Sequence, residues 1–134
     1  MVIKTHLEQA QEQGVAPWDD MVKELPNLVI YRDRYPVTPG HLLFVPKMVD
    51  VSDIGAAMSV ALAWGEAMKS QGDCDGYNIG INMGASAGQT VMYPHVHLIP
   101  RRTGDTANPA GGVRGVIIGQ ADYRRSHYKN PTDK

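Results

Sequence analysis

The sequence predicts an α+β domain built on an antiparallel β-sheet. Short β-prone runs precede and follow a single long amphipathic segment, and the links between neighbouring runs have the length of hairpin connections. A chain of 134 residues is close to the modal size of one domain. We therefore expect one domain over residues 1–134, with its core in about 18–120 and a polar C-terminal tail at 121–134.

The N-terminal third of the chain predicts one short helix and three strands. Residues 1–16 are polar, and their few apolar positions indicate the short helix. Met21–Pro26 and the compact run Leu28–Tyr31 indicate the first two strands, and His41–Val45 indicates the third. Because the loop at 36–40 is rich in proline and ends in glycine, we expect the second and third strands to pair antiparallel.

The central segment Asp50–Gln71 changes to a helical period. Its apolar residues recur at spacings of three and four, as expected for one stripe of an amphipathic helix: Ile54, Ala57, Met58, Ala61, Trp64 and Met68. Ser52 or Asp53 is the expected N-cap, and Gly72 is the expected C-terminal stop.

Further strands are predicted after the helix. Tyr77–Ile81 alternates apolar and polar residues, which is typical of a half-buried strand. Gly84–Gly88 is a loop of small residues, and Thr90–Ile99 is the next strand. Gly115–Ile118 indicates a short terminal strand.

Charge and cysteine content exclude several classes of protein. The 13 basic and 14 acidic residues give a net charge of −1, which argues against a nucleic-acid partner. No apolar run approaches the length of a membrane span, so no membrane partner is expected. The N-terminus has no secretory signal, so the expected location is cytoplasmic. Cys74 is the single cysteine, which excludes a paired-cysteine metal site.

The strand predicted at Thr90–Ile99 carries two histidines on one face. Because side chains alternate along a strand, His95 and His97 project together about 6.5–7 Å apart, while Val96 and Leu98 point into the core. This spacing suits holding one phosphate group between two imidazoles. Since Pro94 lacks an amide donor, we expect an edge strand or a bulge at this point.

The small-residue loop before this strand is a candidate phosphate-binding loop. Its small residues let backbone amides approach an anion, and it has neutral polar side chains at Asn82, Ser86, Gln89 and Thr90. A tight hairpin explains the loop equally well, because the lysine and the glycine spacing of a P-loop are missing.

Two other interpretations of the histidines stay open at this point. A polar sheet face would carry histidines without any function. A metal site would need a third ligand, which His41 or a carboxylate would supply, but no local spacing requires it.

The chain resembles the histidine-triad (HIT) superfamily over about residues 28–118. Four motifs occur in the family's order: Pro36–Lys47, Asn78–Asn82, Ala87–Val91 and Pro94–Arg101. Gly104–Asp105 and Asn108–Arg114 are similar to the downstream part of bacterial members that are labelled dinucleoside polyphosphate hydrolases. The resemblance implies a five-stranded antiparallel sheet with one long helix, a short N-terminal helix and a homodimer.

The resemblance also implies roles for individual residues. His95 matches the nucleophile, His97 the third triad histidine, and His41 a histidine beside the triad. The remaining matched positions are expected to bind the nucleotide: Asp33 at the ribose, and Asn82, Gly88, Gln89, Thr90 and Tyr93 on the phosphate side.

Tyr93 stands where the family's first triad histidine usually stands. A phenol has a pKa near 10, so at neutral pH it donates a hydrogen bond and does not shuttle protons. The contribution of the first histidine is therefore absent, altered or supplied by His41. The paired N-terminal cysteines of zinc-binding members are also missing, so we expect no metal and no cofactor.

The resemblance therefore implies a nucleotide hydrolase. Its substrates would be dinucleoside polyphosphates or related nucleoside phosphate conjugates, attacked at the α-phosphorus by His95. A nucleoside phosphoramidase, a nucleotidyltransferase and a nucleotide-binding module with little turnover are the alternatives. We assign Trp18 and Trp64 to packing, with substrate stacking as the alternative.

Overall fold

The computed structural model describes residues 3–125. The chain forms two compact units, Met1–Arg102 and Thr103–Lys134. Most of the predicted tail, residues 126–134, lies outside the described residues. Within residues 3–125, no helix combines the length and apolar character needed to cross a membrane.

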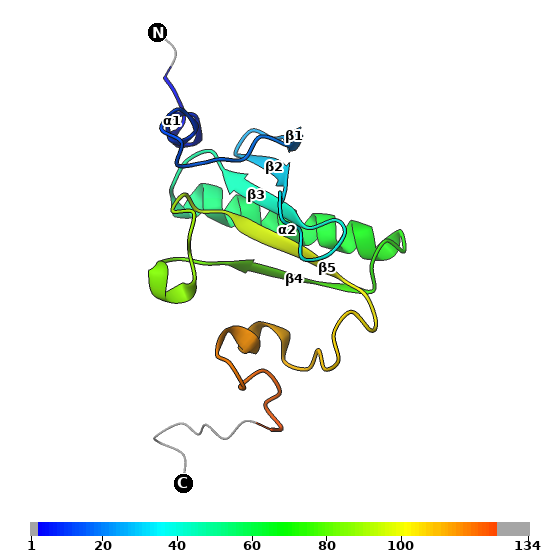
Figure 1. Cartoon of the computed structure of the whole chain (residues 1–134). Coiled ribbons are helices and arrows are strands. Elements are labelled where there is room, and N and C mark those ends of the chain that lie inside the picture. The colour runs from blue at the N-terminus through cyan, green and yellow to red at the C-terminus, as the bar shows by residue number, and fades with distance from the viewer. Residues whose placement is uncertain (1–2, 126–134) are drawn as a thin grey trace. The chain divides into compact units, whose positions relative to one another are not determined.

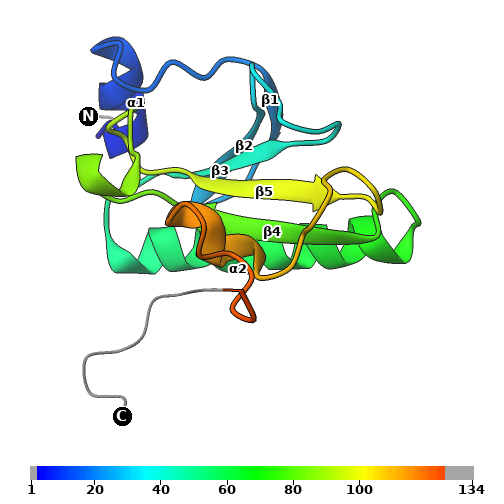
Figure 2. The same ribbon diagram turned by 60° about the horizontal axis from the view of Figure 1, so that its bottom comes forward.

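In its described residues, the first unit contains one antiparallel sheet and two α-helices, as the sequence predicts, and a 3-10 helix at Ala85–Ala87. The strands follow the spatial order β1-β2-β3-β5-β4, and each neighbouring pair is antiparallel. The elements are α1 (His6–Glu12), β1 (Met21–Glu24), β2 (Leu28–Arg32), β3 (Leu42–Pro46), α2 (Val51–Ser70), β4 (Gly76–Ile81) and β5 (Val96–Arg101). Figures 1 and 2 show α2 lying along one face of this sheet.

Strands β2 and β3 are buried on both faces, which explains their uninterrupted apolar runs. On one face of the sheet, every second residue of β2 and β3 packs against α2. Phe44 belongs to this cluster and has no exposed surface. On the other face, Tyr31 and Leu43 pack with Leu7 of α1 and with Tyr93. The candidate site lies next to this cluster, and Leu43 belongs to both.

Helix α2 begins at a different cap from those predicted. The side chain of Asp50 accepts the amide of Asp53 at 2.7 Å, so Asp50 and not Ser52 or Asp53 is the N-cap. The Asp53 carboxylate is instead buried, where it accepts the Met48 amide at 3.0 Å. The predicted stop at Gly72 is confirmed, with a φ of 79° just after the helix.

The strand predicted at Thr90–Ile99 is wrong in its first half. Strand β5 begins at Val96, and residues 90–95 form irregular backbone. Because β5 lies between β3 and β4, it pairs on both sides there, and Pro94 cannot join such a ladder. The expectation of an edge strand or bulge at Pro94 is therefore also wrong. Pro100 is tolerated because β3 pairs with β5 only as far as Leu98.

The short strand predicted at Gly115–Ile118 is also wrong. The second unit has a 3-10 helix at Gly112–Val116 instead. It follows Gly111 at a φ of 80°, where a Cβ atom would lie 1.5 Å from the carbonyl oxygen of Ala121. Glycine-rich backbone with positive φ turns the chain too sharply for a strand.

Candidate active site

The candidate site is a cavity of about 670 Å³ within the first unit. It lies on the sheet face opposite α2, because Val96 and Leu98 of β5 point toward α2 and His97 points the other way. The cavity brings together most of the predicted site residues: Asp33, Asn82, Gly88, Gln89, Thr90, His95 and His97. His41 and Tyr93 do not line it.

The hydrogen bond at His95 fixes which ring nitrogen carries the proton. Nδ1 lies 2.8 Å from the backbone carbonyl oxygen of Tyr93. A carbonyl can only accept, so Nδ1 carries the hydrogen and Nε2 keeps its lone pair. Among residues 3–125, no group forms a hydrogen bond with Nε2. His95 therefore presents an unprotonated nitrogen at the cavity.

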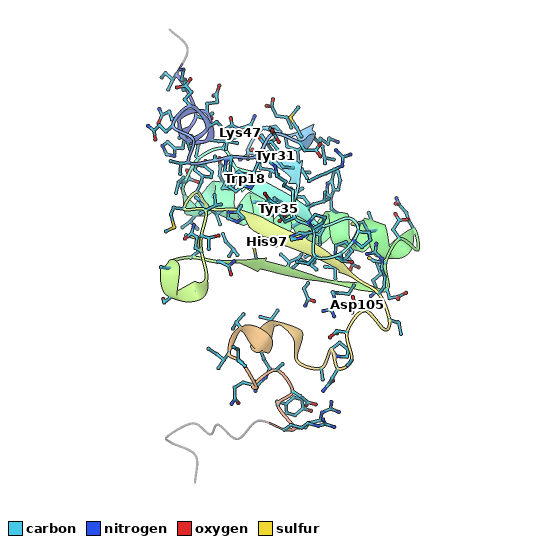
Figure 3. All side chains as sticks on the ribbon, viewed as in Figure 1. Trp18, Tyr31, Tyr35, Lys47, His97 and Asp105 are labelled. Atoms are coloured by element: carbon cyan, nitrogen blue, oxygen red, sulfur yellow. The ribbon has the colours of Figure 1, made fainter. Side chains whose placement is uncertain are left out.

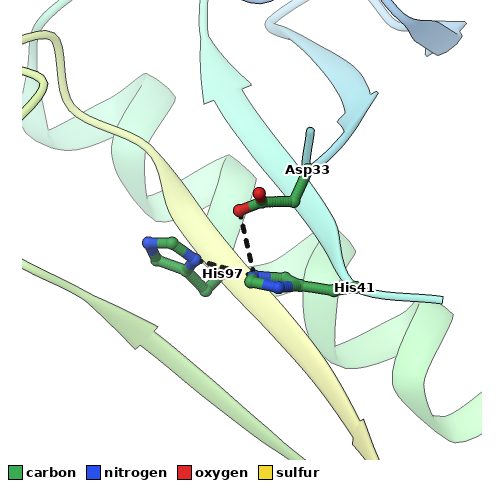
Figure 4. A group of neighbouring side chains, drawn as sticks. All are labelled: Asp33, His41 and His97. Atoms are coloured by element: carbon green, nitrogen blue, oxygen red, sulfur yellow. Dashed lines mark hydrogen bonds and ion pairs between the residues drawn. The ribbon is translucent and has the colours of Figure 1, made fainter. Parts of the chain in front are cut away.

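His97 is held by a chain of hydrogen bonds that starts at the backbone. The Val37 amide donates to Nδ1 of His41 at 3.2 Å, so the proton of His41 is on Nε2. That Nε2 lies 2.9 Å from Nδ1 of His97 and 3.4 Å from a carboxylate oxygen of Asp33. Figure 4 shows both contacts. Nδ1 of His97 accepts this hydrogen bond, so its own proton is on Nε2.

The electrostatics of the site keep both of these rings neutral. Burial lowers the pKa of His97 to about 4, and the neighbouring histidines His95 and His41 add to the effect. Burial also lowers the pKa of His41, although the Asp33 carboxylate acts in the opposite direction. At neutral pH, His97 is therefore a neutral hydrogen-bond donor and not an imidazolium.

The loop at 84–90 offers fewer free backbone amides for binding an anion than the sequence predicts. The amides of Ala87, Gly88 and Gln89 donate to carbonyls inside the loop itself. The expectation that amides around Gly88 cradle a phosphate is therefore corrected for Gly88 and Gln89. The Thr90 amide forms no hydrogen bond with any described residue. The Gln89 side-chain oxygen accepts the Gly84 amide at 2.8 Å, which leaves its NH₂ group as a donor.

Tyr93 lies in the core beneath the site. It packs in the cluster with Tyr31 and Leu43, and its hydroxyl donates to the carbonyl oxygen of Pro46 at 2.6 Å. Burial raises the pKa of this phenol, so the ring stays neutral. Its side chain is thus committed to the fold, while its backbone carbonyl orients His95.

Several cavity residues were not predicted from the sequence. The cavity is also lined by the segment Pro17–Asp20, by Arg32 and by residues 34–36. The Arg32 guanidinium pairs with Asp20 at 2.9 Å, and Arg34 pairs with Asp19 at 3.1 Å. These exposed ion pairs join segments that are distant in sequence, and no local motif marks them.

Trp18 belongs to the same segment and packs against His95. The centroids of the indole and imidazole rings are 4.8 Å apart. The His95 and His97 ring centroids are 5.0 Å apart, so the two histidines do project together as predicted.

Asp33, His41 and His97 also form a group of possible metal ligands. Their ligand atoms lie within 4.8 Å of one another. The two nitrogens that would face an ion already share a proton, because Nε2–H of His41 donates to Nδ1 of His97. An ion would have to displace this proton, so the donor set fits hydrogen bonding and does not fit a resident metal.

Comparisons with known proteins find a matching family and similar structures. The model of the HIT domain matches residues 17–104. A zinc-bound histidine triad family protein from Mycobacterium smegmatis has a similar structure, with a TM-score of 0.62 and 32% identity, covering 74% of this chain and 76% of that one.

Two curated relatives match at similar levels. A HIT-like protein from Chlamydia pneumoniae is 34% identical over 62% of this chain and 82% of its own length. The AP-4-A phosphorylase of Mycobacterium tuberculosis is 35% identical over 53% of this chain. The match spans only 40% of the phosphorylase's length.

The five-stranded antiparallel sheet with its long helix is the fold of a solved histidine triad family protein. The chain belongs to the HIT domain family.

Proposed function

We propose that this protein is a nucleotide hydrolase that acts at the α-phosphorus of dinucleoside polyphosphates or related nucleoside phosphate conjugates. The observation that carries the proposal is the tautomer of His95, whose unprotonated Nε2 is offered to the cavity. A neutral imidazole is a competent nucleophile near pH 7.

The reaction has two displacements at the same phosphorus. The Nε2 lone pair of His95 attacks the α-phosphorus, and the bond from phosphorus to the leaving oxygen breaks, with its electron pair going to the leaving phosphate. The ring then holds the nucleotidyl group on Nε2 and a hydrogen on Nδ1, so it carries a positive charge. Water attacks the phosphorus next, which returns the electron pair to Nε2 and releases a nucleoside monophosphate and a proton.

The other cavity residues would bind the substrate. The Nε2–H of His97 donates to a phosphoryl oxygen or to the leaving oxygen, where negative charge develops. The Thr90 amide and the Gln89 NH₂ group are further donors to the phosphate. Asp33 and Asn82 line the cavity as candidates for the ribose hydroxyls and the phosphate.

The relatives support this substrate class. One is named an AP-4-A phosphorylase, which indicates a dinucleoside polyphosphate. Another, from Arabidopsis thaliana, is named an adenylylsulfatase, which indicates a nucleotide conjugate. The second name favours a broader alternative activity. In it, the chain releases leaving groups other than a nucleotide, or it transfers the nucleotidyl group to an acceptor other than water.

A substrate panel tests the proposal. Purified protein is assayed with diadenosine polyphosphates, an adenosine phosphoramidate and adenylylsulfate, and nucleoside monophosphate is measured. We expect turnover of at least one substrate, with loss of about 10³-fold or more in His95→Asn, because the nucleophile itself is removed. Normal turnover by His95→Asn contradicts the assignment, and binding without turnover by the wild type indicates a nucleotide-binding module.

Two further proposals concern the molecule in solution. We propose that the chain forms a homodimer and acts in the cytoplasm. Strand β4 is an edge strand whose outer side is unpaired within the described sheet, which supports the first. Light scattering on the purified chain tests it, and a monomer at all concentrations contradicts it.

A further inference from the structure

Trp18 packs against the ring of the proposed nucleophile. Its ring centroid is 4.8 Å from that of His95, at an interplanar angle of 54°. It also contacts the ring of Tyr93 at 6.3 Å, and Tyr93 supplies the carbonyl that orients His95. The indole therefore touches both the ring that reacts and the residue that fixes its tautomer.

The chain holds Trp18 in this place by a backbone hydrogen bond at Asp20 and by ring packing. The Asp20 carbonyl accepts the Arg32 amide at 2.9 Å, which ties the segment to β2. The indole packs on the cluster that includes Tyr31, with ring centroids 6.3 Å apart. Figure 3 shows Trp18 next to Tyr31. The ring is thus part of the wall of the cavity and is held against His95.

We propose that Trp18 stabilises positive charge on His95 and so favours the covalent nucleotidyl-imidazole intermediate. This inference rests on the proposed function. When His95 attacks phosphorus, its ring changes from neutral to cationic. An aromatic face within about 6 Å of a cation attracts it, and tryptophan does so more strongly than phenylalanine. Trp18 acts through His95, so it is a positioning residue.

Packing alone would have the opposite effect on His95. Burial of an imidazole disfavours its cation, so a Trp18 that served only to exclude water would make His95 harder to protonate. The other charged and titratable side chains around the cavity stay unchanged when Trp18 is replaced: Asp19, Asp20, Arg32, Asp33, Arg34, Tyr35 and His97, with His41 and Tyr93 next to them. The sign of the change on replacing Trp18 therefore separates the two roles.

An NMR titration measures this sign without any turnover. The ring C–H signal of His95 is followed against pH in the wild type, Trp18→Leu and Trp18→Phe. Trp64→Leu is the control, because Trp64 packs against Phe44 on the opposite face of the sheet. The proposal expects the midpoint to fall by about 0.3–1.5 pH units in Trp18→Leu, and by less in Trp18→Phe. A midpoint that rises or stays the same in Trp18→Leu overturns it.

Kinetics supply a second readout. On the best substrate of the panel, Trp18→Leu should lower kcat by about 2- to 30-fold with little change in KM, and Trp18→Phe should restore part of the rate. A raised KM with unchanged kcat overturns the proposal and assigns Trp18 to substrate stacking. If the wild type shows no turnover, the proposed function fails, and the NMR titration still decides whether Trp18 stabilises the His95 cation.

Discussion

His97 makes the stability of this fold depend on pH, and the size of the effect follows from its surroundings. Burial and the neighbouring histidines lower the pKa of His97 from 6.5 to about 4. Above pH 6.5, the ring is neutral in both the folded and the unfolded chain, so pH has no effect through it. As the pH falls below 6.5, the unfolded chain binds a proton that the folded chain does not, and the folded state loses stability.

The magnitude can be worked out at pH 5. The interval of about 1.5 pH units between 6.5 and 5 corresponds to about 2 kcal/mol at 1.36 kcal/mol per unit. Because the ring is only partly buried, solvent reduces this, and we expect about 1–1.5 kcal/mol. His97→Gln removes the titrating group, while its side-chain oxygen can still accept the hydrogen bond from His41.

Urea unfolding followed by circular dichroism measures the effect. The free energy of unfolding is determined at pH 8 and at pH 5 for the wild type and for His97→Gln. The carboxylates titrate in both proteins, so they cancel in the comparison. We expect the wild type to lose about 1–1.5 kcal/mol more than the variant between the two pH values. Equal losses in the two proteins would refute the argument that His97 is kept neutral by its surroundings.

Two further substitutions test the fold around the site. Tyr93→Phe removes the hydrogen bond to Pro46 and should lower the free energy of unfolding by about 1 kcal/mol, with turnover kept within about 2-fold; a loss of turnover without a loss of stability would instead place the phenol in the chemistry. Gly65→Ala on α2 places a Cβ atom 2.8 Å from the Tyr77 ring and should destabilise the fold by about 1–3 kcal/mol in thermal unfolding; an unchanged midpoint would show that β4 yields there.

Most of the fold could be predicted from the sequence because the apolar patterns are strong. The helix at α2 and the strand at β4 are amphipathic and local, and the structure confirms both. Strands β2 and β3 read as short apolar runs, and their burial on two faces explains why. The predicted start of the last strand was wrong because the alternating pattern in the sequence continues through Tyr93 and Pro94. Pro94 has no amide hydrogen, so it cannot donate to a neighbouring strand where β5 is paired on both sides.

The sequence predicts many residues of the candidate site, but it does not predict which of them form hydrogen bonds with one another. Its histidines stand in a short motif, so sequence alone brings His95 and His97 together. The bond from His41 to His97 joins residues distant in sequence, and only the pairing of β3 with β5 brings them together. Trp18 had no such signal, because its place beside His95 depends on a loop held by tertiary contacts.

The central claim is that Nε2 of His95 forms a bond to the α-phosphorus. Intact-mass spectrometry of protein quenched within one turnover, followed by peptide mapping, tests it most directly. The account predicts that the wild type gains the mass of one nucleotidyl group on His95 and that His95→Asn gains none. Turnover of the same substrate with no adduct at any quench time, or with the adduct on another residue, would contradict it.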